Sequence, residues 1–338
     1  MTIYQARNVL VTGGLGFIGS NLTIRLVELG AKVTVVDSSV EGCGANPHNL
    51  APVRDRVRVI PLDISQAADF APEIARCEVI FNLAGEISHL HSMEFPERDL
   101  EINTTAQLRF LNVCRSAAPG VRIIYAGTRQ IYGVPEYLPV DEAHPINPVD
   151  FNGVHKYAAT MYHLMLARAG YLDAAVLRLT NVYGPRMALH IPCQGLLNAY
   201  LRCMVLGEPL EVFGDGSQVR DMVYVDDVVD AFLLSGAALK LPSSTYNVGG
   251  PEALSIAQVA AVCAAAAGDL PVAYHPFPEE LKRIDIGSYC TDSSRIQREL
   301  GWKPTVRFAD GIRRALDYHL ANLSHYLSGV APRTAAPG

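Results

Sequence analysis

Residues 9–30, VLVTGGLGFIGSNLTIRLVELG, decide the fold of this 338-residue chain. A β-branched apolar run is followed by glycines at the spacing Gly13-x-x-Gly16-x-x-Gly19 and then by a pattern of helical period. This order predicts a strand, a tight turn and a helix, which together form a dinucleotide-binding unit. Gly13 would make the turn, Gly16 would let the backbone approach a pyrophosphate, and Gly19 would let the helix pack closely on the strand.

The alternation of short apolar runs and helical patterns continues through the first half of the chain and predicts a parallel sheet. Strands are expected at 8–12, 32–37, 57–61, 79–83, 122–126 and 175–179, and helices at 16–29, 100–117 and 152–169. Past residue 184, short strands should alternate with helices at 192–206, 225–235 and 256–267.

The predicted fold class is therefore α/β, a Rossmann doubly wound parallel sheet with a smaller C-terminal mixed α/β substrate domain. Residues 1–184 would form the NAD-binding domain and include the catalytic helix. Residues 185–326 would form mainly the substrate-binding domain, and residues 327–338 a flexible tail.

Composition narrows the class of protein. Hydrophobic residues make up 49% of the chain and charged residues 18%, and the net charge is −6, which favours a globular enzyme without nucleic acid as a partner. Seven scattered cysteines without a C-x-x-C pair indicate reduced thiols in a cytoplasmic protein and no metal site. No signal peptide and no apolar run of about 20 residues is found, so we expect no membrane span.

Two carboxylates follow expected strands. Asp37 would bind the adenosine ribose, and no Lys or Arg occurs in the following DSSVEGCG, so the cofactor should be NAD rather than NADP. Asp63 has two alternatives that stay open here: it accepts a hydrogen bond from the adenine, or it caps a turn near Ser65.

Further motifs occur in a fixed order: NLAG (82–85), TRQIYG (128–133), LRLTNVYGPR (177–186), DGSQVRDMVYVDDVVDA (215–231) and LGWKP (300–304). With TGGLGFIG they make nearly the whole chain resemble the extended short-chain dehydrogenase/reductases. The resemblance is to the NAD-dependent nucleotide-sugar epimerase/dehydratase family, of the UDP-galactose 4-epimerase type. It implies the fold above but leaves the sugar open.

The resemblance also implies a set of site residues. The NAD site would comprise Gly13, Gly16, Phe17, Ile18, Gly19, Asp37, Asp63, Ile64, Leu83, Ala84, Gly85, Asn103 and Lys156. Thr128 would bind the reacting sugar hydroxyl, and Lys156 would hold the nicotinamide ribose. Substrate contacts would come from Glu86, Arg129, Asn181, Arg220 and Arg283, with Arg220 and Arg283 clamping the pyrophosphate. For both of these arginines the alternative is a surface ion pair, with Asp221 next to Arg220. Helices 100–117 and 152–169 would pair across a two-fold axis, which implies a homodimer.

One position departs from the family pattern. A tyrosine four residues before the lysine is the family's catalytic base, and here that position is Asn152, whose amide cannot take a proton near neutral pH. Another group could act as the base: His155, Glu86, His89 or His91, whereas Tyr132 and Tyr183 more often pack or line the sugar pocket. A water held by Asn152 and Thr128 could instead relay the proton, or the protein could bind its ligands without catalysis.

A second departure concerns the reaction type. The family's 4,6-dehydratases have Thr-Asp-Glu where this chain has Thr128-Arg129-Gln130, so the acid and base for water elimination are missing. Arg129 puts a cation near the C5–C6 end of the sugar, which would suit a carboxylate or a second phosphate. Its alternative is an outward-facing side chain paired with Glu136 or another acid.

The sequence thus predicts an NAD-dependent nucleotide-sugar epimerase. It would oxidise a sugar carbinol, most simply at C4, to a keto intermediate and return the hydride to the other face, with Thr128, Asn152 and Lys156 as catalytic residues. The alternatives are a nucleotide-uronic-acid decarboxylase or dehydrogenase, and a catalytically silent protein that binds NAD and a nucleotide sugar.

Overall fold

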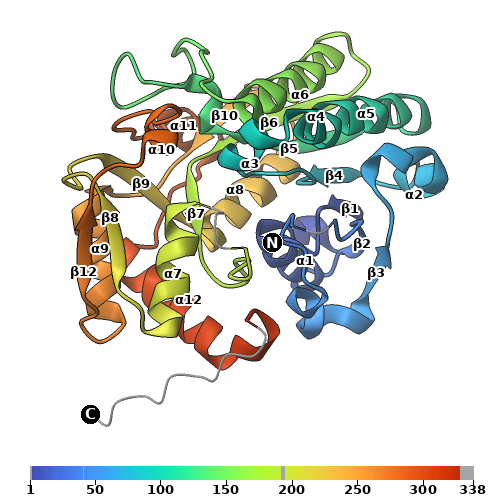
Figure 1. The fold of residues 1–338 in the computed structure, drawn as a ribbon. Coiled ribbons are helices and arrows are strands. Elements are labelled where there is room, and N and C mark those ends of the chain that lie inside the picture. The colour runs from blue at the N-terminus through green and yellow to red at the C-terminus, as the bar shows by residue number, and fades with distance from the viewer. Residues whose placement is uncertain (1, 41, 192–194, 328–338) are drawn as a thin grey trace.

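A seven-stranded sheet forms the centre of the larger lobe in the computed structural model, which describes residues 2–40, 42–191 and 195–327. All of its neighbouring strands are parallel. In spatial order the strands are β3 (Val57–Ile60), β2 (Lys32–Val36), β1 (Asn8–Thr12), β4 (Val79–Asn82), β5 (Arg122–Thr128), β6 (Asp173–Leu179) and β10 (Thr245–Val248) (Figure 1).

Helices cover both faces of this sheet. One face carries α1 (Phe17–Glu28) and α8 (Val225–Ala237), and the other carries α5 (Ala106–Ala117) and α6 (Phe151–Arg168) (Figure 1). Successive side chains of a strand point to opposite faces, so Val9 and Val11 pack in the cluster that includes α1 and α8, whereas Leu10 packs with α5. Burial on both faces explains why β1 is a continuous apolar run.

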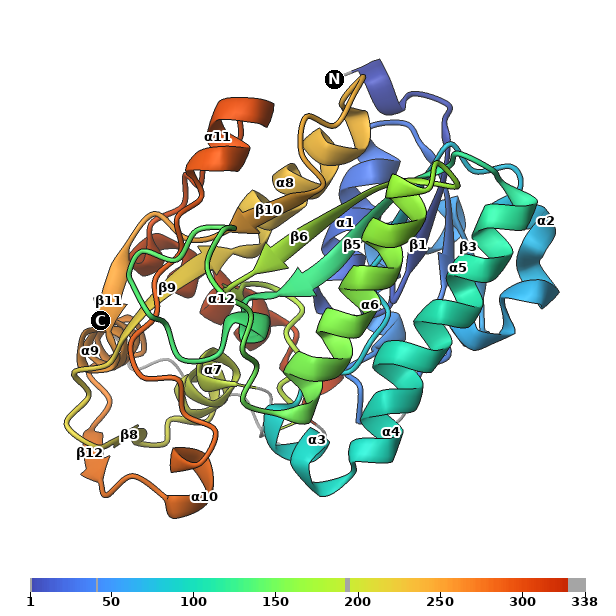
Figure 2. The ribbon, with the colours of Figure 1, turned by 90° about the horizontal axis from the view of Figure 1, so that it is seen from above.

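The smaller lobe lies beyond the carboxyl ends of the strands; the arrowheads of β5 and β6 point toward it in Figure 2. It contains a three-stranded sheet and a parallel two-stranded sheet. Their strands are β7 (Asn181–Tyr183), β9 (Val219–Tyr224) and β11 (Ala253–Ser255), and β8 (Leu210–Phe213) and β12 (Val272–His275). Its helices are α7 (Leu196–Leu206), α9 (Ile256–Ala266), α10 (Glu279–Lys282) and α12 (Phe308–Ala321). Because β9 pairs parallel with β7 and antiparallel with β11, this lobe is mixed.

The predicted fold class is confirmed, and the differences are local. The helix expected at 100–117 is in fact α4 (Pro96–Leu100), a π-helical turn (Glu101–Thr105) and α5 in succession. The helical segment begins four residues earlier than expected, with Pro96 in its first turn, where proline is well suited. The remaining short helices are α2 (Ala71–Ile74), α3 (His89–Glu94) and α11 (Ser294–Leu300).

The chain crosses between the lobes more than once. After β9, helix α8 packs against α1 and strand β10 adds to the edge of the large sheet beside β6, so residues 225–248 return to the larger lobe. A single boundary at residue 184 does not describe this path, and the functional division of the chain stays a prediction. Leu327 is buried in the core of the smaller lobe, and the rest of the expected tail, residues 328–338, lies outside the described residues.

Candidate functional site

The glycine turn lies between β1 and α1, where its backbone leaves no room for side chains. Gly13 has a φ of +68°, and a Cβ added there would lie 2.9 Å from the backbone N of Ala84. A Cβ at Gly19 would lie 2.2 Å from the carbonyl oxygen of Gly13, so only glycine allows α1 to approach the turn this closely. Gly16 is the N-cap of α1 and supplies no capping side chain, which leaves the positive end of the helix open to an anion.

Asp37 follows β2 directly, at the same edge of the sheet. Its carboxylate accepts hydrogen bonds from the backbone N–H groups of Leu15 and Ser39, each at 2.9 Å, and burial raises its pKa. The glycine turn and this carboxylate therefore lie side by side at the carboxyl end of β1. The neighbours of β1 are β2 and β4, so the chain order of the strands reverses here, and such a reversal forms a crevice for ligands.

Asp63 caps a 3₁₀ turn, so the capping alternative is confirmed. Its Oδ1 accepts a hydrogen bond of 2.8 Å from the Ser65 N–H, and the Asp63 N–H donates to Gln66 Oε1 at 3.2 Å. The contact of Asp63 with an adenine stays a prediction. The Ile64 side chain is buried in the apolar cluster between the sheet and α5.

The turn after β4 is tied to β1 by buried hydrogen bonds. Thr12 Oγ1 donates to Asn82 Oδ1 at 2.7 Å and accepts from the N–H groups of Leu83 and Ala84. Beyond it, a Cβ added to Gly85 would lie 2.6 Å from Lys156 Nζ and 2.7 Å from Asn103 Oδ1. The fold thus brings Gly85, Asn103 and Lys156 together from three elements that are far apart in the sequence.

These features fit the dinucleotide that the sequence predicts. The side-chain-free turn at Gly13, the uncapped start of α1 and the Asp37 carboxylate offer the steric and charge properties that a pyrophosphate and a ribose require.

Helix α6 presents buried polar side chains along one face. Asp150 fixes the start of the helix, because its Oδ1 accepts a hydrogen bond of 2.7 Å from the Gly153 N–H. The buried polar residues, spaced so that they lie along one side of the helix, are Asn152, His155, Lys156, Thr160 and His163.

Asn152 is held in one orientation. Its amide nitrogen donates to the Glu86 carbonyl oxygen at 3.0 Å and to Asp99 Oδ2 at 2.9 Å, which uses both amide hydrogens. The other oxygen of Asp99 lies 2.7 Å from His155 Nδ1. Asp99 is buried on α4 and was missed in the sequence analysis, because it stands in no motif and far from Asn152 in the chain.

Lys156 is the ionisable side chain next to the turn at Gly85. Its Nζ lies 5.6 Å from the centre of the Tyr125 ring and makes no hydrogen bond with any residue that the structure describes. Burial lowers the pKa of Lys156 to about 8, and the nearby Asp99 carboxylate opposes this shift. A neutral amine is therefore accessible near neutral pH.

The alternative bases each have another partner. His91 Nδ1 lies 2.5 Å from the buried Glu86 carboxylate, and His89 Nδ1 lies 3.1 Å from Asp150 Oδ2. Tyr132 is buried between Asn247 and Arg178, with its hydroxyl donating to Asn247 Oδ1 at 2.6 Å and accepting from Arg178.

Tyr183 is also fully buried, and burial raises the pKa of both Tyr132 and Tyr183. The packing interpretation of these two tyrosines is confirmed.

Arg129, which follows Thr128 in the chain, and Arg220 of the smaller lobe lie near each other. Arg129 stacks on Tyr289, 5.0 Å from the ring centre, and its Nη2 lies 3.5 Å from Asn181 Oδ1. Arg220 lies close enough to Arg129 that burial, together with the Arg129 charge, lowers the pKa of Arg220 to about 10. Thr128 Oγ1 accepts a hydrogen bond from the Gln130 N–H, which leaves the hydroxyl proton free to donate.

Two of the alternatives stated for these arginines are contradicted. Arg129 does not face outward to Glu136, because it is enclosed by Tyr289 and Asn181. Arg220 pairs with Asp285, at 3.6 Å, rather than with its neighbour Asp221.

The Asp221 carboxylate instead accepts hydrogen bonds from Thr180 Oγ1 and from the Gly250 N–H. Arg283 is exposed on the turn after α10, so its expected role in the clamp rests on the resemblance alone.

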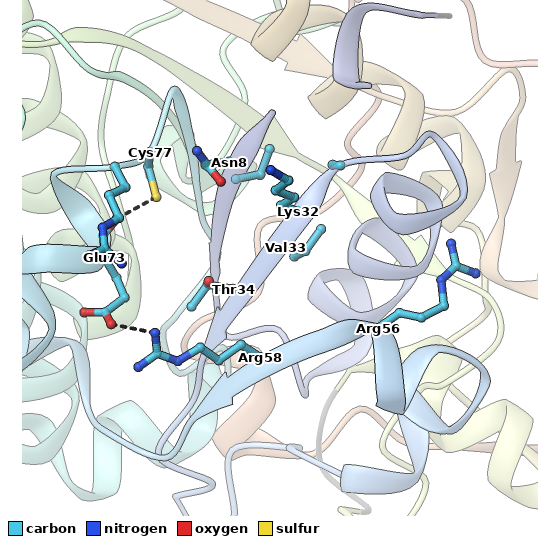
Figure 3. Close-up of a pocket in the computed structure, with 11 residues that line it drawn as sticks. Asn8, Lys32, Val33, Thr34, Arg56, Arg58, Glu73 and Cys77 are labelled. Atoms are coloured by element: carbon cyan, nitrogen blue, oxygen red, sulfur yellow. Dashed lines mark hydrogen bonds and ion pairs between the residues drawn. The ribbon is translucent and has the colours of Figure 1, made fainter. Parts of the chain in front are cut away.

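A cavity of about 350 Å³ lies elsewhere, at the opposite ends of the strands. Asn8, Lys32 and Arg58, at or near the starts of β1, β2 and β3, line it, and Figure 3 shows Arg58 directed toward Glu73, with the ion pair at 2.7 Å. This cavity is separate from the glycine turn. In the described part of the chain, no three side chains of His, Cys, Asp or Glu are grouped as a metal site, and no helix is long and apolar enough to span a membrane.

The fold and the site define an α/β protein that binds a dinucleotide at the rim of its large sheet and carries a second lobe over that rim. Residues 9–249 match the NAD dependent epimerase/dehydratase family, and the chain belongs to this family, whose cofactor is NAD. The chain is an extended short-chain dehydrogenase/reductase of the nucleotide-sugar epimerase type.

Curated relatives match over almost the whole chain. The chain is 32% identical to the UDP-glucose 4-epimerase of Mycolicibacterium smegmatis, over 91% of this chain and 97% of that protein. It is 28% identical to UDP-glucuronic acid decarboxylase 1 of Xenopus tropicalis, over 94% of this chain and 73% of that protein.

Solved structures agree with these relatives. The UDP-glucose 4-epimerase of Thermotoga maritima with UDP-glucose superposes with a TM-score of 0.84 at 31% identity, over 94% of this chain and 99% of that chain. The dTDP-glucose 4,6-dehydratase DesIV of Streptomyces venezuelae, with NAD and TYD bound, has a TM-score of 0.83 at 27% identity, over 93% and 97% of the two chains.

Proposed function

We propose that this protein is an NAD-dependent nucleotide-sugar epimerase. The glycine turn, Asp37 and Lys156 would hold NAD, which would supply reversible hydride transfer at a sugar carbinol carbon, most simply C4, so that the configuration there is inverted. The observation that carries the proposal is the buried Lys156 amine beside Gly85, on the helix turn that follows Asn152. It supplies the single proton acceptor that such a reversible oxidation needs.

The side chains at positions 128–130 support epimerisation over dehydration. Thr128 would orient the reacting hydroxyl, since its own proton is free to donate. Gln130 is bonded through its amide to Asp150 at 2.6 Å, and Arg129 stays cationic, so neither can act as the acid or base of an elimination.

Lys156 is the group that we assign as the proton acceptor in place of the missing phenol. Asn152 cannot take a proton, and its amide is fixed by Glu86 and Asp99. The Asn152 carbonyl oxygen would accept a hydrogen bond from the substrate or from a water and so position it. Lys156 would take the hydroxyl proton as the neutral amine and give it back when the ketone is reduced.

A product assay tests this function. The purified protein is incubated with UDP-glucose, UDP-galactose and UDP-glucuronic acid while absorbance at 340 nm and sugar stereochemistry by NMR are followed. We expect an isomer without net NADH. Accumulation of NADH would identify a one-way dehydrogenase, loss of carbon dioxide a decarboxylase, and thermal stabilisation by a sugar without any turnover a silent binding protein.

Asn152→Tyr tests whether the absent phenol limits the rate. We expect turnover to fall and the melting temperature to drop, because the larger ring displaces the amide and leaves Asp99 Oδ2 without its donor. Loss of a hydrogen bond to a buried carboxylate costs about 1.5–3 kcal/mol. Asn152→Ala, which removes the same bonds without added volume, is the control. Faster turnover in Asn152→Tyr would show that the site lacks a base rather than using Lys156.

A homodimer is proposed because large apolar side chains are exposed on adjacent helices. Helices α4, α5 and α6 lie side by side in Figures 1 and 2 and carry the exposed Leu100, Leu108, Val154 and Met165. Such a cluster of exposed apolar residues is typical of an interface between copies.

Val154→Arg should convert the dimer to a monomer, because it places a charge in this apolar surface. The mass is measured by light scattering. Leu239→Arg changes a fully exposed leucine away from these helices and should leave the mass unaltered. A wild-type protein with the mass of one chain would contradict the proposed dimer.

The six cysteines that the structure describes are free thiols, which supports the cytoplasmic location that we also propose.

A further inference from the structure

Arg129 is half-buried, and its positive charge has no carboxylate in contact among the described residues. Within this part of the chain its guanidinium meets the amide oxygens of Gln130 and Asn181, at the long distances of 3.4 and 3.5 Å, and the face of Tyr289. No carboxylate in the described part of the chain forms an ion pair with it. Burial lowers the pKa of Arg129, and the charges of Asp221, Asp150 and Asp285 oppose this shift from a distance.

The acidic groups nearest to Arg129 are already used. Asp285 pairs with Arg220 and also accepts a hydrogen bond of 2.7 Å from Gln218. Asp221 accepts from Thr180 Oγ1 at 2.8 Å and from the Gly250 N–H at 3.3 Å. Asp150 caps α6 and binds Gln130. With these carboxylates engaged elsewhere, the Arg129 guanidinium is available to pair with an anion brought by a ligand.

We propose that Arg129 forms a carboxylate subsite and that the substrate is therefore a nucleotide uronic acid, a sugar whose C6 is a carboxylate. This inference rests on the proposed function, which supplies the nucleotide sugar. It extends that function by naming the substrate class.

The position of Arg129 favours the sugar ring over the diphosphate as the source of the anion. Arg129 follows Thr128 directly at the carboxyl end of β5, and Thr128 is the residue that would bind the reacting hydroxyl. Arg220 comes from β9 of the smaller lobe, where its guanidinium already contacts the Gly287 carbonyl and Asp285, and the resemblance assigns it to the diphosphate. Tyr289 stacks on one face of the planar Arg129 guanidinium and so restricts its orientation.

The experiment compares two substrates that differ only at C6, UDP-glucose and UDP-glucuronic acid. For the wild type, kcat/KM and the dissociation constant by calorimetry are measured with both. We expect UDP-glucuronic acid to be preferred in both measurements. In Arg129→Met, the preference ratio should fall by about 10²-fold, the effect typical of removing one partner of a buried charge pair. Arg129→Lys should retain part of the ratio, because the charge remains without the planar fork.

Arg220→Gln is the matched control. It should weaken both sugars by the same factor and leave the preference ratio unaltered, since both carry the same diphosphate. NAD binding and the melting temperature of each variant show that it is folded.

Two results would overturn the inference while leaving the proposed function intact. The first is that the wild type isomerises UDP-glucose without any preference for the uronic acid. The second is that Arg129→Met lowers the affinity and kcat/KM equally for both sugars, which would assign Arg129 to the diphosphate. A binding preference for UDP-glucuronic acid that depends on Arg129, without any isomerisation, would support the subsite and overturn the epimerase.

Discussion

Lys156→Met lowers turnover by about 10²–10⁴-fold, the usual contribution of a general base. The methionine fills most of the volume of the lysine stem but cannot accept a proton. Because the side chain is buried and has no hydrogen-bond partner among the described residues, its removal should cost little stability. The measurement is kcat with the preferred UDP-sugar, together with the melting temperature of the variant.

Lys156→Arg separates the two roles of this residue. A guanidinium keeps the positive charge that would hold the ribose, but it does not deprotonate in proteins. We expect Lys156→Arg to be nearly as slow as Lys156→Met. If Lys156→Arg keeps most of the activity, the residue acts through its charge, and the base must be sought among the other groups of the site.

The pH dependence of kcat is a second test of Lys156 as the proton acceptor. The neutral amine is the form that accepts the proton, and the fraction of this form rises with pH through the lowered pKa of about 8. Activity should therefore increase by about tenfold per pH unit below that value and level off above it. A profile that is flat from pH 6 to 9 in the wild type would contradict the assignment.

Gly19→Ala should unfold or strongly destabilise the larger lobe. The new Cβ would lie 2.2 Å from the Gly13 carbonyl oxygen, so α1 must move away from β1. Overpacking of this kind costs about 1–3 kcal/mol and sometimes more. Because α1 carries the positive end that faces the cofactor, NAD affinity should fall as well. Urea unfolding and NAD titration measure the two effects.

Gly16→Ala is the graded comparison. A Cβ at Gly16 would lie 3.2 Å from the same oxygen, and the residue has an ordinary extended conformation, so the variant should fold. Its effect should be seen mainly in NAD affinity, because the methyl group lies at the N-cap where a pyrophosphate would approach. Equal destabilisation by the two substitutions would show that close helix–strand packing is not the reason for Gly19.

Much of the larger lobe could be predicted because its signals are local. The run VLVTG, the glycine spacing and the helical period of the next residues each reflect backbone geometry within one βαβ unit. The strands of the large sheet occur within a few residues of the expected positions, apart from β10. That strand was missed because Thr245–Val248 is short and gains its place only by pairing with β6.

The site was only partly predictable. Gly13, Gly85, Thr128 and Lys156 stand in motifs, so their types and order indicate the chemistry. The residues that hold Asn152 and Arg129 in place occur in no motif. Asp99 holds Asn152 from a short helix more than fifty residues away, and Tyr289 supports Arg129 from the other lobe. Such pairs depend on how helices and lobes pack, which no local pattern specifies.

By itself, the sequence determined that the chain folds as a doubly wound sheet with a glycine turn for a dinucleotide, because glycine spacing and apolar period act over a few residues. It also showed that the usual phenol is absent at position 152. Only the tertiary structure decided that the Asn152 amide is committed to Asp99 and Glu86, that the Lys156 amine is buried without a hydrogen-bond partner among the described residues, and that Arg129 stacks on Tyr289. The reason is physical: burial and the pairing of charges are properties of the folded surroundings, and they set protonation and ligand preference.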